Sequence, residues 1–254
     1  MNTTIENYYS GISGLVLPVP NKLHYPDEFK NRSRLCYYAS LTNSIEINSA
    51  FYKIPLSSTI KKWTSEVPEY FRFTFKLFKG ITHNRELTFE PEMVTDFFNV
   101  ISGVAHKKGC LLVQLPPSVR IGQFSRLNIL MAVLNENNKD DKWKIALEFR
   151  HPSLYCEKVY ELLDSYKISM VIHDKFATTS PIHAKNQEFV YLRFHGPEGN
   201  YKGSYEEDIL HKYAFFIKEY LDENKQVYVY FNNTMGEAFA NLIMLRQIVQ
   251  DNIQ

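Results

Sequence analysis

Short runs of β-prone residues alternate with longer amphipathic runs along almost the whole chain, and this alternation limits the possible folds more than any other feature. The expected strands are Tyr9–Ser13, Ser44–Ile47, Phe71–Lys76, Cys110–Gln114, Lys144–Glu148, Ser169–Ile172, Phe189–Arg193 and Val227–Phe231. The expected helices are Ser57–Glu66, Pro91–Lys107, Gln123–Asn137, Ser153–Tyr166, Tyr205–Asn224 and Met235–Gln250. Strands that alternate with helices predict a parallel sheet with crossover helices.

Eight such strands predict that the sheet closes into a (β/α)8 barrel of the TIM type, and the alternative is a doubly wound open sheet. The length of 254 residues suits one barrel domain over residues 1–254. The segment between Asp174 and Glu188 has no clean helical periodicity. We therefore expect the barrel to be irregular there, or to lack an outer helix after the sixth strand.

Composition and charge exclude several classes of protein. A formal net charge of +1 argues against binding nucleic acid over the whole surface. The three cysteines include no C-x-x-C pair, which argues against a disulfide framework and a structural zinc site. The first ten residues lack the apolar core of a signal peptide, and no apolar run approaches the roughly 20 residues of a membrane-spanning helix. We expect a cytoplasmic protein with reduced thiols and no membrane partner, and its oligomeric state stays open.

Many of the expected strands end in a polar or charged residue. In a barrel these ends all lie on one face, where active sites are assembled. One such residue alone is more often a solvated turn residue, but the coincidence of so many favours a real pocket. The residues at or just beyond these ends are Glu46, Asn48, Lys76, His83, Gln114, Glu148, Arg150, His173, Asp174, Arg193, His195, Gly196 and Asn232.

Glu46 is expected to point into the barrel, because side chains alternate between the two faces of a strand. It lies between Ile45 and Ile47, so it faces the interior if the isoleucines face the helices. A carboxylate in that position needs a partner, and Lys76 and Arg193 are the natural ones. The sequence leaves open whether this is a structural salt-bridge network or a working acid, base or hydroxyl ligand.

Basic side chains are expected around the same opening. Glu148 and Arg150 share one side of their strand, and Arg193 and His195 repeat that spacing. Guanidinium groups suit the recognition of phosphate or carboxylate, and Gly196 would let a ligand approach the backbone closely. Two alternatives stay open: the arginines bind an anionic ligand, or they are neutralised by nearby carboxylates.

Cofactor sites have little support in the sequence. The side chains that could meet as metal ligands are His83, His151, His173, Asp174 and His195. Their spacing includes no H-x-H or H-x-x-x-H, and the neighbouring Arg and Lys disfavour a cation. There is also no P-loop, no G-x-G-x-x-G and no G-x-S-x-G motif. We therefore expect no cofactor, with a metal ion as the less favoured alternative.

Three functions are compatible with these residues. The first is a hydrolase or isomerase that acts on a small phosphorylated or polyhydroxylated substrate, with Glu46 or Glu148 as base and His195 or His173 as acid. The second is a nucleic-acid-binding or processing protein, and the third is a non-catalytic barrel for an anionic or sugar-like ligand. The candidate catalytic residues are Glu46, Glu148, His195, His173 and Asp174. The candidate ligand-binding residues are Asn48, Tyr52, Lys76, His83, Gln114, Arg150, Arg193, Gly196, Tyr201 and Asn232. In the nucleic-acid hypothesis, the aromatic side chains that would stack on bases are Phe51, Tyr52, Phe194 and Tyr201.

Motifs in chain order resemble a known family over nearly the whole sequence. They are the segments 44–52 (SIEINSAFY), 71–76 (FRFTFK), 81–83 (ITH), 112–117 (LVQLPP), 146–153 (ALEFRHPS), 191–196 (YLRFHG) and 229–233 (VYFNN), with Trp63 and Pro68. In these the chain resembles the YecE-like family, domain of unknown function 72. The resemblance implies a TIM-type barrel, distantly similar to the endonuclease IV and xylose isomerase barrels, and implies no settled reaction.

The chain departs from the family pattern at its first strand. The family's opening reads Gly-Thr-Ser-Gly-Trp, whereas Gly11-Ile-Ser-Gly-Leu15 stands here. The resemblance therefore transfers no contact of that Thr hydroxyl or that Trp to this chain. The metal clusters of the two distantly similar barrels have no clear counterpart in this sequence either.

Overall fold

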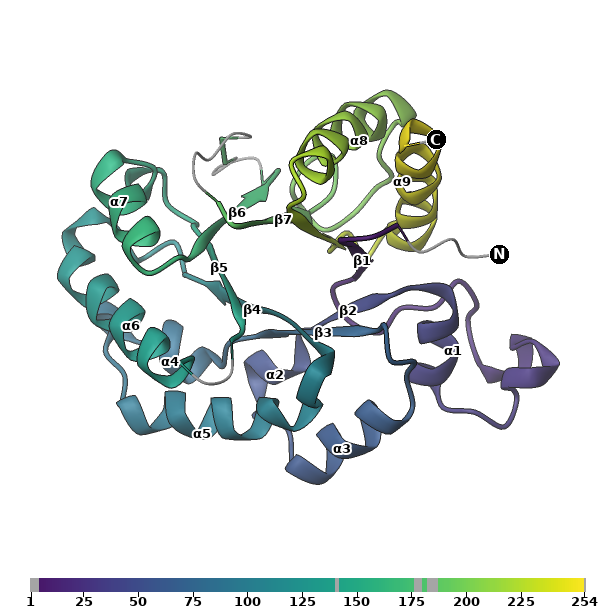
Figure 1. The fold of residues 1–254 in the computed structure, drawn as a ribbon, viewed down its shortest axis with the longest axis horizontal. Coiled ribbons are helices and arrows are strands. Elements are labelled where there is room, and N and C mark those ends of the chain that lie inside the picture. Colours follow the sequence, from purple (N-terminus) through teal and green to yellow (C-terminus); the bar gives the residue numbers. More distant parts are fainter. Residues whose placement is uncertain (1–4, 140–141, 176–179, 182–186, 254) are drawn as a thin grey trace.

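Eight parallel strands form a nearly closed barrel in the computed structural model, which describes residues 5–139, 142–175, 180–181 and 187–253 (Figure 1). The strands are β1 (Tyr8–Ile12), β2 (Ser44–Ile47), β3 (Arg72–Lys76), β4 (Lys108–Gln114), β5 (Lys144–Glu148), β6 (Ser169–His173), β7 (Phe189–Phe194) and β8 (Gln226–Phe231). Their order in the sheet is β1-β8-β7-β6-β5-β4-β3-β2, and every neighbouring pair is parallel. The predicted barrel is confirmed, and the alternative of an open doubly wound sheet is wrong.

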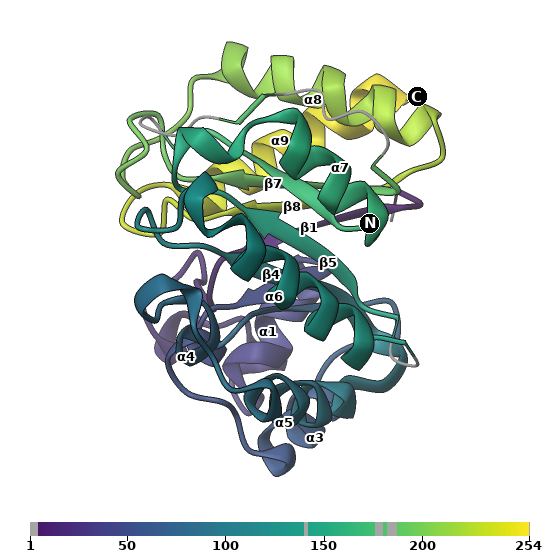
Figure 2. The ribbon, with the colours of Figure 1, turned by 90° about the vertical axis from the view of Figure 1, so that its left-hand side faces the viewer.

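Helices surround the strands on the outside. They are α1 (Arg34–Leu41), α2 (Ser49–Tyr52), α3 (Ser57–Ser65), α4 (Lys79–Thr82), α5 (Pro91–Ile101), α6 (Phe124–Asn137), α7 (Glu157–Ser165), α8 (Glu207–Asp222) and α9 (Ala238–Ile253). The 3-10 turns are Lys22–His24, Asp27–Phe29, Arg85–Leu87, Ser102–Lys107, Ile121–Gln123 and Pro152–Leu154. Figure 2 shows α8 and α9 on one side of the strands and α1, α3 and α5 on the other. None of the described helices is long and apolar enough to cross a membrane.

The helices differ from the predicted ones most clearly at α5 and α1. The helix predicted over Pro91–Lys107 ends at Ile101, because Ala105 has a φ of 53° and the intervening turn is a 3-10 helix. Helix α1 was not predicted, although Ser33 caps it by accepting a hydrogen bond from the Cys36 N–H at 3.0 Å. In the irregular segment after β6, the described residues 174–175, 180–181 and 187–188 form no helix. The rest of that segment, 176–179 and 182–186, lies outside the described residues.

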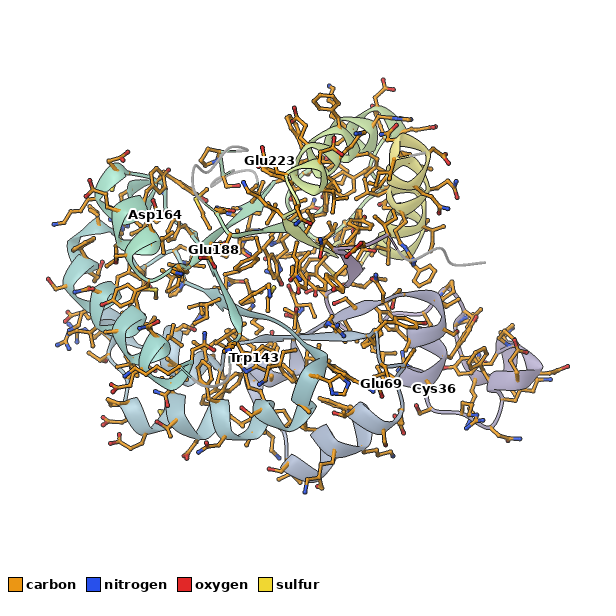
Figure 3. All side chains as sticks on the ribbon, viewed as in Figure 1. Cys36, Glu69, Trp143, Asp164, Glu188 and Glu223 are labelled. Atoms are coloured by element: carbon orange, nitrogen blue, oxygen red, sulfur yellow. The ribbon has the colours of Figure 1, made fainter. Side chains whose placement is uncertain are left out.

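Side chains of the strands lie within the barrel (Figure 3), and many of them are buried in a packed core, as is usual for this fold. One buried cluster consists of residues from the beginning and middle of the strands: Cys110, Leu112, Ala146, Val171, Phe189, Tyr191, Tyr228 and Tyr230. Tyr230 bonds to Ser44 Oγ at 2.6 Å and to Thr74 Oγ1 at 2.7 Å. A second cluster packs the outer faces of the strands against the helices. The carboxyl ends of the strands lie beyond the cluster that contains Tyr191 and Tyr230.

Strands β1 and β2 meet at a seam where side chains supplement the backbone pairing. The only backbone bridge described between them joins Ser13 and Glu46. The Asn43 amide bonds to β1 at both Ser10 N and Tyr8 O, each at 2.8 Å. The Tyr38 hydroxyl accepts from Ile12 N at 2.7 Å and donates to Ser44 O at 3.1 Å. Side chains thus complete the barrel where the strands do not form a regular ladder.

We expect Gly11→Ala to destabilise the barrel at this seam. A Cβ at position 11 would lie 2.0 Å from the Ser44 carbonyl oxygen and 2.9 Å from the Tyr38 hydroxyl. Relief of such overlap forces backbone shifts, so the free energy of unfolding should fall by about 1–3 kcal/mol. Chemical denaturation measures the loss. Gly122→Ala is the matched control, because a Cβ there meets nothing within 4 Å, and an equal loss in both variants would contradict the prediction.

Candidate functional site

A layer of polar side chains lies at the carboxyl ends of the strands, directly above the packed core. Because side chains alternate along a strand, the residue two positions after a core residue such as Leu112, Tyr191 or Tyr230 faces the same interior. We call these residues the mouth layer. They are Ser13, Glu46, Lys76, Gln114, Glu148, His173, Arg193 and Asn232, together with Asn48, Arg150 and His195 one step further out.

Arg193 and Glu46 form the centre of the mouth layer. Glu46 is fully buried and Arg193 is 2% exposed. Arg193 Nη2 lies 2.7 Å from Glu46 Oε1, and its Nε lies 3.2 Å from both carboxylate oxygens. The hydroxyl groups of Ser13 and Tyr191 also donate to this carboxylate. Every direction from which Glu46 accepts is therefore occupied by a protein donor. The expected interior position of Glu46 agrees with this geometry, but its ion-pair partner is Arg193 and not Lys76.

Glu148 joins Arg193 to Arg150. Arg193 Nη1 donates to Glu148 Oε2 at 3.0 Å, and Arg150 Nη2 forms an ion pair with Glu148 Oε1. The Gln114 side-chain oxygen accepts from Arg193 at 3.1 Å and from Arg150 at 3.2 Å. Two buried guanidinium groups thus face two buried carboxylates, and a neutral amide oxygen lies between them. Both arginines have carboxylate partners inside the protein.

This arrangement fixes the charge of the carboxylate at Glu148. Burial would raise the pKa of the Glu148 carboxyl, but the guanidinium groups of Arg150 and Arg193 more than offset burial and hold that pKa well below its usual range. A carboxylate with a low pKa is a weak base, because it binds a proton poorly at neutral pH. The geometry therefore favours Glu148 as a hydrogen-bonding and orienting group over the general base of the sequence hypothesis.

His195 is neutral in this environment. Burial lowers the pKa of its imidazole to about 4, although Glu148 opposes the shift. Its Nε2 lies 2.9 Å from Arg150 Nη2 and accepts that hydrogen bond, which leaves the proton on Nδ1. Asp174 lies beside it: one oxygen accepts from the His195 backbone N–H at 2.7 Å and the other accepts from the Tyr205 hydroxyl. A neutral imidazole is a poor general acid. This geometry therefore favours a role for His195 in holding the Arg150 side chain in place.

His173 and Gly196 have structural contacts of their own. His173 Nδ1 accepts from the Lys175 backbone N–H at 3.2 Å, and its Nε2 lies 3.1 Å from the Phe149 carbonyl oxygen. Both ring nitrogens are therefore engaged by backbone groups. Gly196 has a φ of 99°, and a Cβ there would lie 2.3 Å from the Lys202 carbonyl oxygen. Its lack of a side chain is needed for this turn.

Lys76 differs from every other charged group of the mouth layer. Its ammonium is part-buried and lies 4.0 Å from the centre of the Phe51 ring. It forms no hydrogen bond or ion pair with any residue that the structure describes. Burial lowers the pKa of Lys76 to about 7, and the charge of Arg193 adds to this effect. At neutral pH a large share of this side chain is therefore an uncharged amine.

Aromatic side chains surround Lys76 at the rim. The rings of Phe51 and His83 pack edge to face with centroids 4.8 Å apart, and Tyr52 is 66% exposed beside Phe51. Burial and the charge of Lys76 lower the pKa of His83 to about 4. Tyr201 lies elsewhere on the rim, with its ring centre 5.6 Å from that of His195. The predicted residues Tyr52, His83 and Tyr201 thus lie around the opening.

One predicted position is wrong. Phe194 is 1% exposed and stacks on Phe231 with ring centroids 4.6 Å apart, in the layer between strands and helices. Alternation explains this, because Arg193 and His195 point inward and Phe194 must point outward. Another residue, His151, is engaged locally by Ser153 at 2.8 Å and lines a separate surface pocket with Arg120. Neither side chain belongs to the mouth layer.

Sequence reasoning missed three residues that hold the site together. Ser13 donates to Glu46 and accepts from Asn48 Nδ2 at 2.6 Å and from Arg193 Nη2 at 3.1 Å. Tyr191 was predicted only as a residue of the seventh strand, and Tyr205 as the start of a helix. The alternation that turns Arg193 inward also turns Tyr191 inward, so that signal was available. No local signal identifies Ser13 or Tyr205, because their partners are distant in the sequence.

Four buried polar atoms of the mouth layer have no hydrogen-bond partner among the described residues. They are Asn48 Oδ1, Glu148 Oε1, Arg150 Nε and His195 Nδ1. Two of these atoms do have charged neighbours: Glu148 Oε1 is ion-paired with Arg150, and His195 Nδ1 lies 3.5 Å from Asp174 Oδ1. Buried polar groups in native proteins are almost always paired, with protein, water or ligand. Asn48 Oδ1 and Arg150 Nε are therefore the clearest unpaired polar atoms of the described mouth layer.

The donor set does not resemble a metal site. In the described part of the chain, no three His, Cys, Asp or Glu side chains are grouped as ligands of one ion. The three cysteines are free thiols, and Cys36 lies on α1 at the periphery of the barrel (Figure 3). The two carboxylates at the centre are instead held by guanidinium groups.

Known proteins share both the sequence pattern and the fold. Residues 9–254 match the family model described as "Protein of unknown function DUF72". UPF0759 protein YunF of Bacillus subtilis (strain 168) is 27% identical over 247 residues, which cover 85% of this chain and 86% of YunF. The crystal structure of a DUF72 family protein from Enterococcus faecalis V583 has a TM-score of 0.78 and 24% identity, covering 96% of this chain and 95% of that one.

A more distant structure shows how widely this barrel shape occurs. The 3-keto-D-glucoside 4-epimerase YcjR from E. coli has a TM-score of 0.59 at 10% identity, covering 96% of this chain and 98% of that one. At this identity the likeness concerns the fold alone. The match of the family model is of a different kind, because it spans almost every residue and agrees with the resemblance found in the sequence. The chain belongs to the DUF72 family.

Proposed function

We propose that this protein is an enzyme that binds a small polyhydroxylated molecule at the mouth layer. It removes a carbon-bound proton from this molecule and returns one, as isomerases do. The observation that carries the proposal is the mixture of unsatisfied donors and acceptors in one buried layer. Asn48 Oδ1 accepts hydrogen bonds, whereas Arg150 Nε donates them. A hydroxyl group does both, so a polyol can satisfy both of these atoms.

A phosphorylated substrate is the weaker alternative. Phosphate oxygens only accept hydrogen bonds at neutral pH, and they need unpaired cations. Arg193 is held by Glu46 and Glu148, and Arg150 by Glu148. An anion at this position would have to compete with those buried carboxylates and would lie close to them. The neutral balance of guanidinium and carboxylate groups suits a neutral ligand better.

Lys76 is the group that supports catalysis over mere binding. The carboxylates of Glu46 and Glu148 and the ring of His173 already have hydrogen-bond or ion-pair partners within the protein. Lys76 has no such partner among the described residues, and its pKa of about 7 lets it give or take a proton at neutral pH. A 3-keto-D-glucoside 4-epimerase shares the fold, and its name places it among enzymes that act on sugars.

We expect the protein to catalyse exchange of a carbon-bound proton with solvent when it is incubated with short ketoses or aldoses. Proton NMR in D2O would follow the loss of the signal next to the carbonyl, and thermal shift would report binding of the same compounds. Matched polyols without a carbonyl should bind and show no exchange. A thermal shift with phosphate or sulfate but none with any sugar or polyol would reverse the choice of substrate class. Sugar binding without exchange would favour the non-catalytic barrel instead.

A further inference from the structure

We propose that Lys76 is a nucleophile which forms a Schiff base with the carbonyl group of the substrate, so that the substrate class is a polyhydroxylated aldehyde or ketone. This inference rests on the proposed function, because it uses the same mouth layer. It goes further in two ways: the reaction includes a covalent step, and the polyhydroxylated ligand carries a carbonyl group.

Position is the first support. Lys76 is the last residue of β3, and two residues before it the side chain of Thr74 bonds to the interior Tyr230. By the alternation of the strand, Lys76 therefore faces the interior at the open end of the barrel. Its Nζ lies over the Phe51 ring at 4.0 Å and forms no ion pair with a described carboxylate. A buried structural lysine normally has a carboxylate or carbonyl partner. Lys107 is one, because its Nζ donates to two backbone carbonyls at 2.9 and 2.8 Å.

The charges around Lys76 are the second support. The charged groups that act on Lys76 are Arg193, Arg150, Glu148 and Glu46, and the titratable rim group beside it is His83. The two carboxylates are already bound to the two guanidinium groups. Burial and the nearby guanidinium groups lower the pKa of Lys76 to about 7. A cationic neighbour and an apolar wall are the means by which proteins activate a lysine amine as a nucleophile.

The covalent step balances without any further reagent. The lone pair of Nζ attacks the carbonyl carbon, and the electron pair of the C=O bond moves to oxygen, which gains a proton released from nitrogen. The hydroxyl group of the resulting carbinolamine takes a proton from solvent and leaves as water, and a positively charged iminium remains. The iminium withdraws electrons from the neighbouring carbon and makes its C–H bond more acidic. The C–H proton passes to solvent water, because the Lys76 nitrogen is now bonded to the substrate. Return of a solvent proton to the same carbon and hydrolysis of the iminium complete the exchange and release the amine.

The test is reductive trapping with dihydroxyacetone and sodium cyanoborohydride on the intact protein. A trapped Schiff base adds the mass of the probe less one oxygen atom, and peptide mapping by mass spectrometry locates it. At pH 7 an amine with a pKa of about 7 is about half uncharged, against roughly one part in 2,500 for an ordinary lysine. We expect Lys76 to be labelled at least about tenfold faster than any other lysine.

Matched variants separate the outcomes. Lys76→Arg keeps a positive charge but forms no Schiff base, so labelling at this site should vanish while the thermal shift with dihydroxyacetone persists. Lys79→Met removes a lysine of α4 that lies over Tyr52, and labelling of Lys76 should continue. Binding and proton exchange without a trapped adduct at Lys76 would overturn the covalent step alone. Absence of both binding and exchange would overturn the proposed function as well, and equal labelling of many lysines would show that Lys76 is not activated.

Discussion

Arg193→Met is expected to lower the free energy of unfolding by about 3–5 kcal/mol, because it leaves buried charges without a partner. Glu46 and Glu148 are both fully buried, and both are ion-paired to this guanidinium. Glu148 retains Arg150, whereas among the residues that the structure describes the Glu46 carboxylate retains the hydroxyl groups of Ser13 and Tyr191. The loss should therefore come mainly from Glu46. Urea denaturation followed by circular dichroism gives the free energy directly.

Two further variants show whether charge or geometry causes that loss. Arg193→Lys keeps the charge but loses the forked contact with Glu46, so it should be destabilised less than the Met variant. Arg126→Met, at an exposed position of α6, is the control and should change stability by no more than about 0.5 kcal/mol. A loss in Arg193→Met as small as that of the control would mean that the carboxylates are protonated or solvated in the folded protein.

Strand periodicity explains why so much of the fold and the position of the site could be predicted. A two-residue repeat decides which face a side chain takes, so Glu46, Gln114, Glu148 and Arg193 could all be assigned to the interior from their apolar neighbours. The same rule assigns Phe194 to the face that packs against the helices. Its predicted position at the opening of the barrel did not follow the rule and is wrong. The barrel follows from the count of strands and helices, which needs no knowledge of any contact.

The hydrogen-bond and ion-pair partners of the site residues could not be predicted, because they depend on how the barrel closes. Ser13 reaches Glu46 across the seam between the first and second strands, and Tyr205 reaches Asp174 from a different loop. Gln114 bridges two arginines that are 43 positions apart in the numbering. Such contacts are set by the stagger of eight strands around one axis. Sequence alone left open whether the arginines were neutralised internally, and only the geometry shows both with carboxylate partners.

Lys76→Met is expected to stabilise the protein at neutral and mildly acidic pH, unlike the arginine variants. Folding lowers the pKa of Lys76 from 10.5 to about 7, so the folded state binds this proton more weakly than the unfolded state does. A shift of this size corresponds to at most about 4–5 kcal/mol, and the partial exposure of the ammonium reduces the expected gain to about 2 kcal/mol. Loss of the cation–π contact with Phe51 opposes the gain by only about 0.5–1 kcal/mol.

The pH dependence of that difference identifies its cause. A base with a lowered pKa destabilises the folded state fully below about pH 7, and the penalty disappears as pH rises towards 10.5, where the unfolded state also loses the proton. The advantage of Lys76→Met over the wild type should therefore be largest near pH 6 and shrink steadily up to about pH 10. Urea denaturation of both proteins across this range measures it. A variant that is less stable than the wild type near pH 6 would show that Lys76 is a structural cation with a partner. If replacing Lys76 instead makes the folded protein more stable, this is typical of a residue kept for its reactivity. Active sites retain charged groups that the stability of the fold alone would not favour.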